Sequence, residues 1–256
     1  MQLGRITLFP IKSLDGVSVE SARVTRGGIL ENDRVWAIYD VAGKVVNGKR
    51  TAHVHDLRCN FDADFREVRL WQNGAASQTQ FQLDDRAPIG KWLSEFFGFA
   101  VELRHEFEKG FPDDLTAFGP TIVSEASLCT VQSWFPELTL ESVRHRFRAN
   151  LELCNDEAFC EDRLYGAPDE LKPFHLGLVK FFAHNPCQRC VVPTRDAVTG
   201  AATADFQKKF MQLRREQLPH WANAQRFNHF YRFAVNTSIP PTEAGKQLRV
   251  GDLISF

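Results

Sequence analysis

The chain has 256 residues, 43% of them hydrophobic, and its 31 Lys and Arg residues nearly balance 32 Asp and Glu residues for a formal net charge of -1. This length and composition predict a globular protein of one large or two small domains, and the near-neutral charge excludes a chain-wide field for nucleic acid or an anionic membrane. Any anion site must therefore be built locally. The sequence shows no export signal and no apolar run of bilayer length, so we expect a cytoplasmic protein whose six cysteines are reduced.

The first hundred residues alternate between apolar and polar positions in the manner of short strands separated by Gly and Asp. The predicted strands are residues 5–9, 17–25, 35–39, 65–71, 78–83 and 101–104. A helix is predicted from near Pro88 to Gly98, which stands where a C-terminal cap belongs. Its apolar stripe is expected to pack on that sheet.

A polar segment with Gly and Pro pairs, residues 106–120, suits a linker. We therefore predict two domains, residues 1–108 and 109–256. In the second, helical spacing follows Ser124 and Thr139, and a helix is predicted over residues 205–218. The best predicted strands of this half are residues 150–154, 178–183 and 230–236, and residues 249–254 read as strand, turn and strand. The pattern as a whole predicts an α+β fold dominated by strands.

Two cysteines flank an arginine in Cys187-Gln188-Arg189-Cys190. Thiols beside a fixed positive charge are poised for thiolate chemistry, and this spacing suits half a zinc site, a redox pair or a single metal thiolate. His184 and His175 would complete a zinc tetrad, although Pro186 and the lack of a second compact ligand pair oppose it. A purely structural role as small apolar residues also stays open.

Three further clusters combine charge with turn residues. Lys12 and Ser13 follow the first strand, Arg34 lies in a turn-rich run, and residues 146–150 read Arg-Phe-Arg-Ala-Asn. If that last segment is extended, Arg146, Arg148 and Asn150 share one side and form an anion-facing ledge. Taken singly, each cation is more typical of an exposed turn or a surface ion pair.

The order of these motifs along the chain resembles the MOSC superfamily, and within it the mitochondrial amidoxime reducing component and its bacterial relatives. The motifs are Pro-Ile-Lys-Ser at 10–13, Asp-Arg at 33–34, Arg-Phe-Arg-x-Asn at 146–150, Glu-Asp at 161–162, and Cys-x-Arg-Cys followed by Thr-x-Asp-x-x-Thr-Gly at 187–200. The resemblance extends to Val250-Gly251-Asp252. It implies an N-terminal β-barrel-like domain followed by a MOSC β-barrel domain with peripheral helices.

The resemblance also implies a molybdenum cofactor and assigns site residues. Cys190 would ligate molybdenum and be the catalytic residue. The residues implied to bind the anionic pterin or its phosphate are Lys12, Ser13, Arg34, Arg148, Gln188 and Arg189, with Asn150 matching the asparagine of the same motif. Bidentate arginines and a lysine are the side chains that neutralise a phosphate, and soft sulfur suits the metal.

Several positions depart from the family pattern. They are Leu14, Ala149, Arg195 and Ala197, together with residues 48–55, which contain His53 and His55. We expect these departures to affect substrate preference more than cofactor binding. If residues 48–55 form a strand, the two histidines share one face, which suggests either a second metal site or ordinary satisfied or solvent-facing side chains.

The implied activity is reduction of N-hydroxylated compounds, such as amidoximes or N-hydroxylated nucleobases, by removal of an oxygen atom. Asp196 and Glu161 are candidate proton donors by position only. The alternatives are a sulfur or molybdenum-cofactor carrier with a persulfide on Cys190 or Cys187, and a zinc-stabilised binding module. The chain has neither a ferredoxin-type cysteine run nor a Gly-x-Gly-x-x-Gly fingerprint, so we expect a separate electron-donor protein as partner.

Overall fold

The computed structural model describes residues 1–168 and 170–256. Its largest element is an eight-stranded sheet in the order β15-β11-β12-β13-β9-β10-β1-β2. The pair β9 and β10 is parallel, and the other neighbours are antiparallel. The strands are β1 Gln2–Leu8, β2 Val17–Val19, β9 Ile122–Ser124, β10 Leu151–Cys154, β11 Lys172–Leu176, β12 Val179–Gln188, β13 Arg232–Ser238 and β15 Ile254–Ser255.

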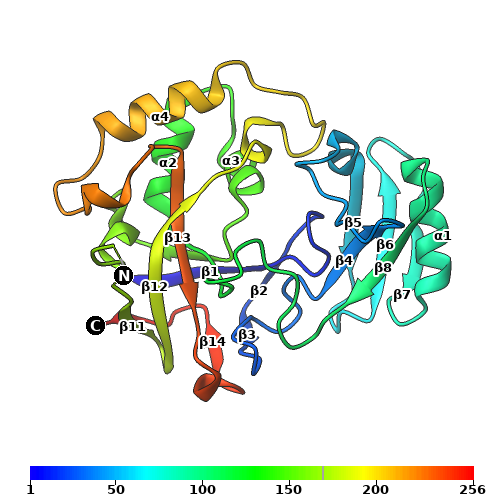
Figure 1. The fold of residues 1–256 in the computed structure, drawn as a ribbon, viewed down its shortest axis with the longest axis horizontal. Coiled ribbons are helices and arrows are strands. Elements are labelled where there is room, and N and C mark those ends of the chain that lie inside the picture. The colour runs from blue at the N-terminus through cyan, green and yellow to red at the C-terminus, as the bar shows by residue number, and fades with distance from the viewer. Residues whose placement is uncertain (169) are drawn as a thin grey trace.

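Three helices lie along one side of this sheet, as Figure 1 shows. They are α2 Glu125–Trp134, α3 Leu140–Phe147 and α4 Phe206–Glu216. Helix α2 begins after Ser124 and α3 after Thr139, and each of these two side chains accepts a hydrogen bond from the backbone N–H three residues later. Such caps satisfy orphan N–H groups of the first turn, which confirms the two predicted helix starts.

A second lobe lies beside the large sheet in Figure 1. It contains the pair β4 Trp36–Asp40 and β8 Val101–His105, and the three-stranded sheet of β5 Leu57–Phe61, β6 Glu67–Gln72 and β7 Thr79–Gln82. Helix α1, Arg86–Phe97, buries Ile89, Leu93 and Phe97 and ends at Gly98 with a φ of 75°. Glycine adopts this left-handed conformation without a Cβ penalty, so the predicted cap is confirmed.

The chain crosses between the lobes at its start. Strand β1 pairs with β2 and β10, and β3 (Ser21–Arg23) pairs with β14 (Gln247–Arg249). One hydrophobic cluster accordingly joins Leu3 and Ile6 with Leu151 and Phe174, whereas the buried members of a second all lie within residues 11–103. The boundary between residues 108 and 109 stays a prediction, and β1 and β3 pair across it.

Strands account for 31% and helices for 23% of the structure, which confirms a mixed α+β fold with more strand than helix. No closed barrel is detected in the described residues, because the large sheet runs as an open series from β15 to β2. The structure therefore differs from the closed barrels that the family resemblance implies. Both end strands are only two or three residues long, and such short edges offer few backbone groups for closure. Within the same residues no helix is long and apolar enough to cross a membrane.

An ion pair is buried between α4 and the 3₁₀ turn Cys160–Arg163. Arg214 donates to Asp162, and the two side chains are only 1% and 4% exposed. The Arg214 guanidinium also lies 3.9 Å from the centroid of the Phe159 ring. Removing one partner from such a pair leaves an uncompensated charge in a medium of low dielectric constant.

We therefore predict that Arg214→Met lowers the free energy of unfolding by about 3–5 kcal/mol, because it leaves the buried Asp162 carboxylate without its ion-pair partner. Urea unfolding monitored by tryptophan fluorescence measures the change. The matched control is Arg215→Met on the exposed face of the same helix, which should shift the free energy by less than about 0.5 kcal/mol. Equal losses in the two variants would contradict a special role for the buried pair.

Candidate functional site

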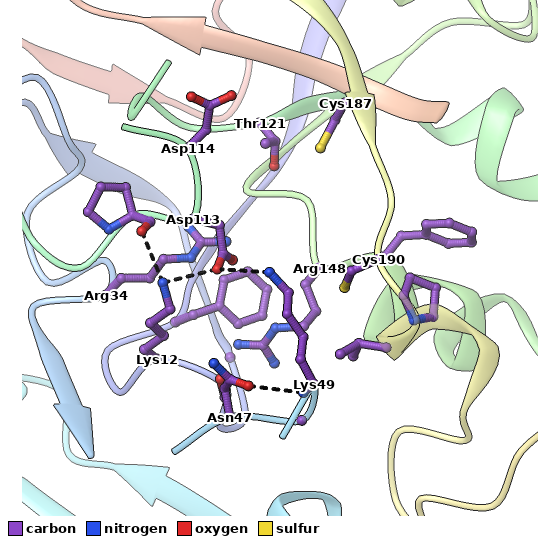
Figure 2. A pocket seen from close by; sticks show the side chains of 18 of the residues that line it. Lys12, Arg34, Asn47, Lys49, Asp113, Asp114, Thr121, Arg148, Cys187 and Cys190 are labelled. Carbon is purple, nitrogen blue, oxygen red and sulfur yellow. Dashed lines mark hydrogen bonds and ion pairs between the residues drawn. The ribbon is translucent and has the colours of Figure 1, made fainter. Parts of the chain in front are cut away.

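A cavity of about 560 Å³ lies where loops of the two lobes meet. Its walls come from the loop after β1, residues 47–58, the polar segment 109–121, the end of α3, and residues 185–197 after and within β12. Figure 2 shows Cys187 and Cys190 on the β12 side of the cavity, with Lys12, Asp113 and Lys49 across from them. This size is ordinary for a site that binds a small molecule or cofactor.

The two thiols lie at the C-terminal end of β12. Cys187 is in the strand and Cys190 follows it, and both are partly exposed and line the cavity. Arg189 donates to the Cys187 Sγ at 3.3 Å and to the carbonyl of Phe147. The Cys190 Sγ has no hydrogen-bond partner among the residues that the structure describes. The Cys190 sulfur, just after the end of β12, is thus free to bind a ligand. It lies next in sequence to Arg189, whose guanidinium is hydrogen-bonded to the Phe147 carbonyl.

Lys12 is buried and turned toward the polar segment. Its Nζ donates to the carbonyls of Phe111 and Pro112 at 2.8 and 3.0 Å and pairs with Asp113 at 3.0 Å. Lys49 lies 3.7 Å from the same carboxylate. Burial lowers the pKa of Lys12, although Asp113 partly offsets this. The segment predicted as a linker is therefore a folded wall of the cavity, because Lys12 binds its backbone.

The carboxylate of Asp113 stays ionised despite its surroundings. Burial alone would raise its pKa, but the charges of Lys12, Arg34 and Lys49 hold the pKa well below its usual range. The sequence did not single out Asp113 or Lys49. Two adjacent aspartates in a linker-like run carry no signal of their own, since only the fold brings them to the lysines.

Arg34 and Asn150 belong to one hydrogen-bond network. The Arg34 guanidinium donates to Asp33 and, at 3.0 Å, to the Asn150 Oδ1. The Asn150 Nδ2 donates to the Asp33 Oδ1 and to the Thr7 carbonyl, each at 3.0 Å. Asn150 is fully buried and is not among the residues lining the cavity, so its contacts here are with the protein.

Arg148 contributes a positive charge that forms no ion pair with the described residues. It is the C-cap of α3 with a φ of 52°, and its guanidinium lies 4.1 Å from the centroid of the Phe9 ring. The guanidinium makes no ion pair or hydrogen bond with any residue that the structure describes. Burial, reinforced by the charge of Arg34, lowers the pKa of Arg148 to about 10. A cation in this position is stabilised by an anionic ligand.

The extended ledge expected at residues 146–150 is wrong, because α3 continues to Phe147 and the chain then turns left-handed at Arg148. Arg146 is consequently buried, donates to the carbonyl of Pro193 at 3.0 Å and faces Asp196 at 3.8 Å. Both Arg146 and Arg148 nevertheless line the cavity. Capping by Thr139 and the apolar face of the helix outweigh the alternation on which the expectation rested.

Ser13 and Gln188, the other residues predicted to bind the pterin, also line the cavity. Ser13 has a φ of 74°, a conformation that few non-glycine residues adopt. Gln188 is exposed. Among the departures, Leu14 and Ala149 are buried, Arg195 donates to the carbonyl of Gly48 at 2.7 Å, and the Ala197 carbonyl faces Arg58 at 3.4 Å.

Neither candidate proton donor lines the cavity. Asp196 accepts from the backbone N–H groups of Val198 and Thr199 in its own turn. Glu161 is 1% exposed and accepts from the Ser127 hydroxyl, and burial, with the neighbouring Asp162, raises its pKa to about 7. The structure thus places both carboxylates in supporting positions.

The histidines do not assemble into metal sites. His53 and His55 lie on the 3₁₀ turn Ala52–Asp56 rather than on a strand; His53 stacks on Phe96, while His55 lines the cavity. His184 bonds to the Ser238 hydroxyl at 2.7 Å, and His175 is an exposed residue of β11. No group of three potential His, Cys, Asp or Glu ligands occurs in the described part of the chain. The alternative of a zinc tetrad is therefore not supported by the described residues.

Comparisons with known proteins agree with this architecture. Residues 1–87 match the model of the MOSC N-terminal beta barrel domain, and residues 114–255 match that of the MOSC domain. The molybdenum cofactor sulfurase of Drosophila melanogaster is 24% identical over 249 residues, covering 85% of this chain and 30% of that protein. The sulfurase of Drosophila yakuba is 23% identical over 285 residues, covering 99% and 34%.

The chain therefore spans about a third of the length of these curated relatives. The sulfurase names describe those longer proteins. Since the MOSC-domain model alone covers more than half of the chain and the N-terminal model covers much of the rest, the chain belongs to the MOSC family.

Proposed function

We propose that this chain binds the molybdenum cofactor in the cavity and reduces N-hydroxylated compounds, such as amidoximes or N-hydroxylated nucleobases, by removing an oxygen atom. The observation that carries the proposal is the meeting in one cavity of a free thiol, Cys190, and a partly buried guanidinium without an ion-pair partner among the described residues, Arg148. A group that is both metal-bearing and anionic satisfies the two together.

The residues present fit that group. Cys190 offers a soft sulfur ligand, and Arg148, Arg34 and Lys12 supply positive charge for a pterin phosphate from three different segments of chain. The orphaned buried Nε of Arg189 adds a donor without a partner among the described residues. When bound, the molybdenum centre would supply the two-electron chemistry of oxygen removal.

The protein residues themselves would orient the ligand and exclude water. Ser13, Arg34 and Arg148 all have positive φ, a conformation that costs non-glycine residues of order 1 kcal/mol each. Protein contacts support two of these residues, because Asn150 bonds to the Arg34 guanidinium and the Arg148 guanidinium lies over the ring of buried Phe9. The site is thus pre-organised, so that less ordering is required when an anion binds.

One observation favours a second candidate function, a sulfur carrier. Arg189 approaches the Cys187 Sγ at 3.3 Å, which is the contact that stabilises a thiolate or persulfide. The similarity to proteins named molybdenum cofactor sulfurase points the same way. Elemental and pterin analysis of the purified chain separates the two functions: molybdenum with pterin supports the reductase, and cyanide-releasable sulfur without metal supports the carrier.

We predict that Cys190→Ser folds but loses both bound molybdenum and amidoxime reduction, because a hydroxyl is a harder and poorer ligand than a thiolate. Cys187→Ser should keep most of both, and Cys129→Ser on the exposed face of α2 is the matched control. Molybdenum per protein and turnover of a test amidoxime are the measurements. Unchanged activity per molybdenum in Cys190→Ser would contradict the assignment of Cys190 as the metal ligand. Equal losses of molybdenum and activity in the Cys187 and Cys190 variants would indicate a paired-thiol site.

The anion-binding side chains give a second prediction. Arg148→Ala and Lys12→Ala should each lower pterin content, and Arg148→Lys should also lower it, because a point charge does not reproduce a bidentate fork. Neither substitution at Arg148 adds backbone strain, since the native residue already has a Cβ at positive φ. Pterin content of purified variants is the readout, with the exposed Arg66→Ala as control. Wild-type content in all three variants would show that these side chains do not hold the cofactor.

The source of electrons gives a third prediction. We expect the molybdenum-loaded chain to reduce a test amidoxime with reduced viologen but not with NADH or NADPH alone, because its sequence has no dinucleotide fingerprint or ferredoxin-type cysteine run. A turnover assay of the isolated chain checks this. Sustained nicotinamide oxidation coupled to amidine formation, with no second protein present, would contradict the need for a separate electron donor.

A further inference from the structure

The cavity concentrates positive charge in a chain whose formal net charge is -1. Ten Lys or Arg side chains line it, against four Asp and no Glu. Several of these cations already have carboxylate partners: Lys12 and Lys49 share Asp113, Arg34 pairs with Asp33, and Arg58 pairs with Asp15 at 2.8 Å. The other cations of the cavity wall include some whose charge no carboxylate of the described residues offsets within ion-pair distance.

Arg195 is one of these, and it lies on a different wall from Lys12 and Arg34. It follows the 3₁₀ turn Val192–Thr194, and a β-bridge to Ala202 fixes its backbone. Its Nη1 donates to the carbonyl of Gly48 at 2.7 Å, which ties the loop to the other lobe. Among the described residues no carboxylate lies within ion-pair distance of Arg195. Most of its N–H groups therefore remain for a ligand.

His55 stands beside Arg195 with an unused polar atom. Its Nε2 is buried and has no hydrogen-bond partner in the described chain. A Cβ placed on Gly48 would lie 3.0 Å from that Nε2, so the glycine leaves room for the ring at this position. Burial, and then the charge of Arg195, lowers the pKa of His55, although a backbone hydrogen bond with Ala197 partly offsets this, and the neutral imidazole is favoured. A neutral imidazole still donates one hydrogen bond.

We propose that Arg195 and His55 form an oxyanion site for the charged end of the substrate, so that the enzyme acts on N-hydroxylated compounds that carry a carboxylate or phosphate group. The proposal rests on the proposed reductase function and adds the substrate class. A guanidinium fork binds either oxyanion in bidentate fashion, and the imidazole adds one N–H donor from the neighbouring turn. Arg148, which likewise has no carboxylate within ion-pair distance among the described residues, is left for the cofactor.

Three probes with the same reacting group test the substrate class in the molybdenum-loaded full chain: benzamidoxime, its 4-carboxylate and its 4-phosphate ester. We expect kcat/KM for at least one charged probe to exceed that for the neutral probe by about tenfold, mainly through a lower KM. A charge-assisted hydrogen bond of ordinary strength accounts for a difference of this size. Arg195→Gln and His55→Gln should lower this preference, the former by about tenfold. Arg195→Lys should give an intermediate preference.

The exposed Arg215→Gln is the matched control, because it removes the same charge from the surface of α4. It should leave the preference at the wild-type value. Absence of any preference for charged probes in the wild type, or an equal loss in the Arg215 and Arg195 variants, would overturn the oxyanion site.

A binding measurement separates this inference from the proposed function. Calorimetric titration of the loaded chain with benzamidine and its 4-carboxylate and 4-phosphate measures binding of the products, which lack the N-hydroxyl oxygen that the reaction removes. Tighter binding of a charged product, weakened about tenfold in Arg195→Gln, supports the site whether or not the chain reduces amidoximes. The tighter of the two charged products identifies the preferred oxyanion. Equal Kd values for charged and neutral products would overturn the site even if reductase activity is found.

Discussion

The hydrogen-bond network around Asn150 is the constraint on which the site depends. This buried amide bonds at once to the Asp33 carboxylate, the Arg34 guanidinium and the carbonyl of Thr7. It thereby joins the end of β1, the turn before β4 and the start of β10, three segments that are far apart in sequence. An amide with all these partners satisfied is costly to disrupt, since each orphaned group would be left without water. Arg148 and Lys12, which both line the cavity, lie within five residues of Asn150 and Thr7 along the chain.

The concentration of charge beside that junction follows from the same arrangement. Burial opposes ionisation of Lys12, Arg148 and Asp113, yet all three are held close together. Asp113 offsets the charge of Lys12, whereas Arg148 has no such partner among the described residues. A protein that keeps an uncompensated cation in a partly buried position is stabilised by the anion that binds there. The free energy required to hold the Arg148 charge without an ion-pair partner is thus recovered when an anion binds, and it contributes to the affinity for that anion.

The two lobes contribute different parts of the cavity. Residues of the MOSC domain supply Cys190, Arg148 and Arg195, and residues of the N-terminal domain supply Lys12, Arg34 and His55. The Arg195 hydrogen bond to Gly48 closes one side between them. Because the wall that faces the ligand is assembled from both, changes in the loop at residues 47–58 can alter the cavity without touching the thiols.

Elements whose signals are local could be predicted from the amino-acid sequence. Helix caps at Ser124, Thr139 and Gly98, the alternating strands, and the spacing of Cys187 and Cys190 depend on near neighbours in the chain, and the ordered motifs were enough to indicate the MOSC family. Only the tertiary structure decided that β1 joins the second half, that the polar segment at 109–121 is a wall of the site, and that α3 replaces the expected ledge. It also decided which cations keep carboxylate partners and which do not. These properties depend on pairing and burial between distant segments, because desolvation and ion-pair distances exist only once the chain has folded.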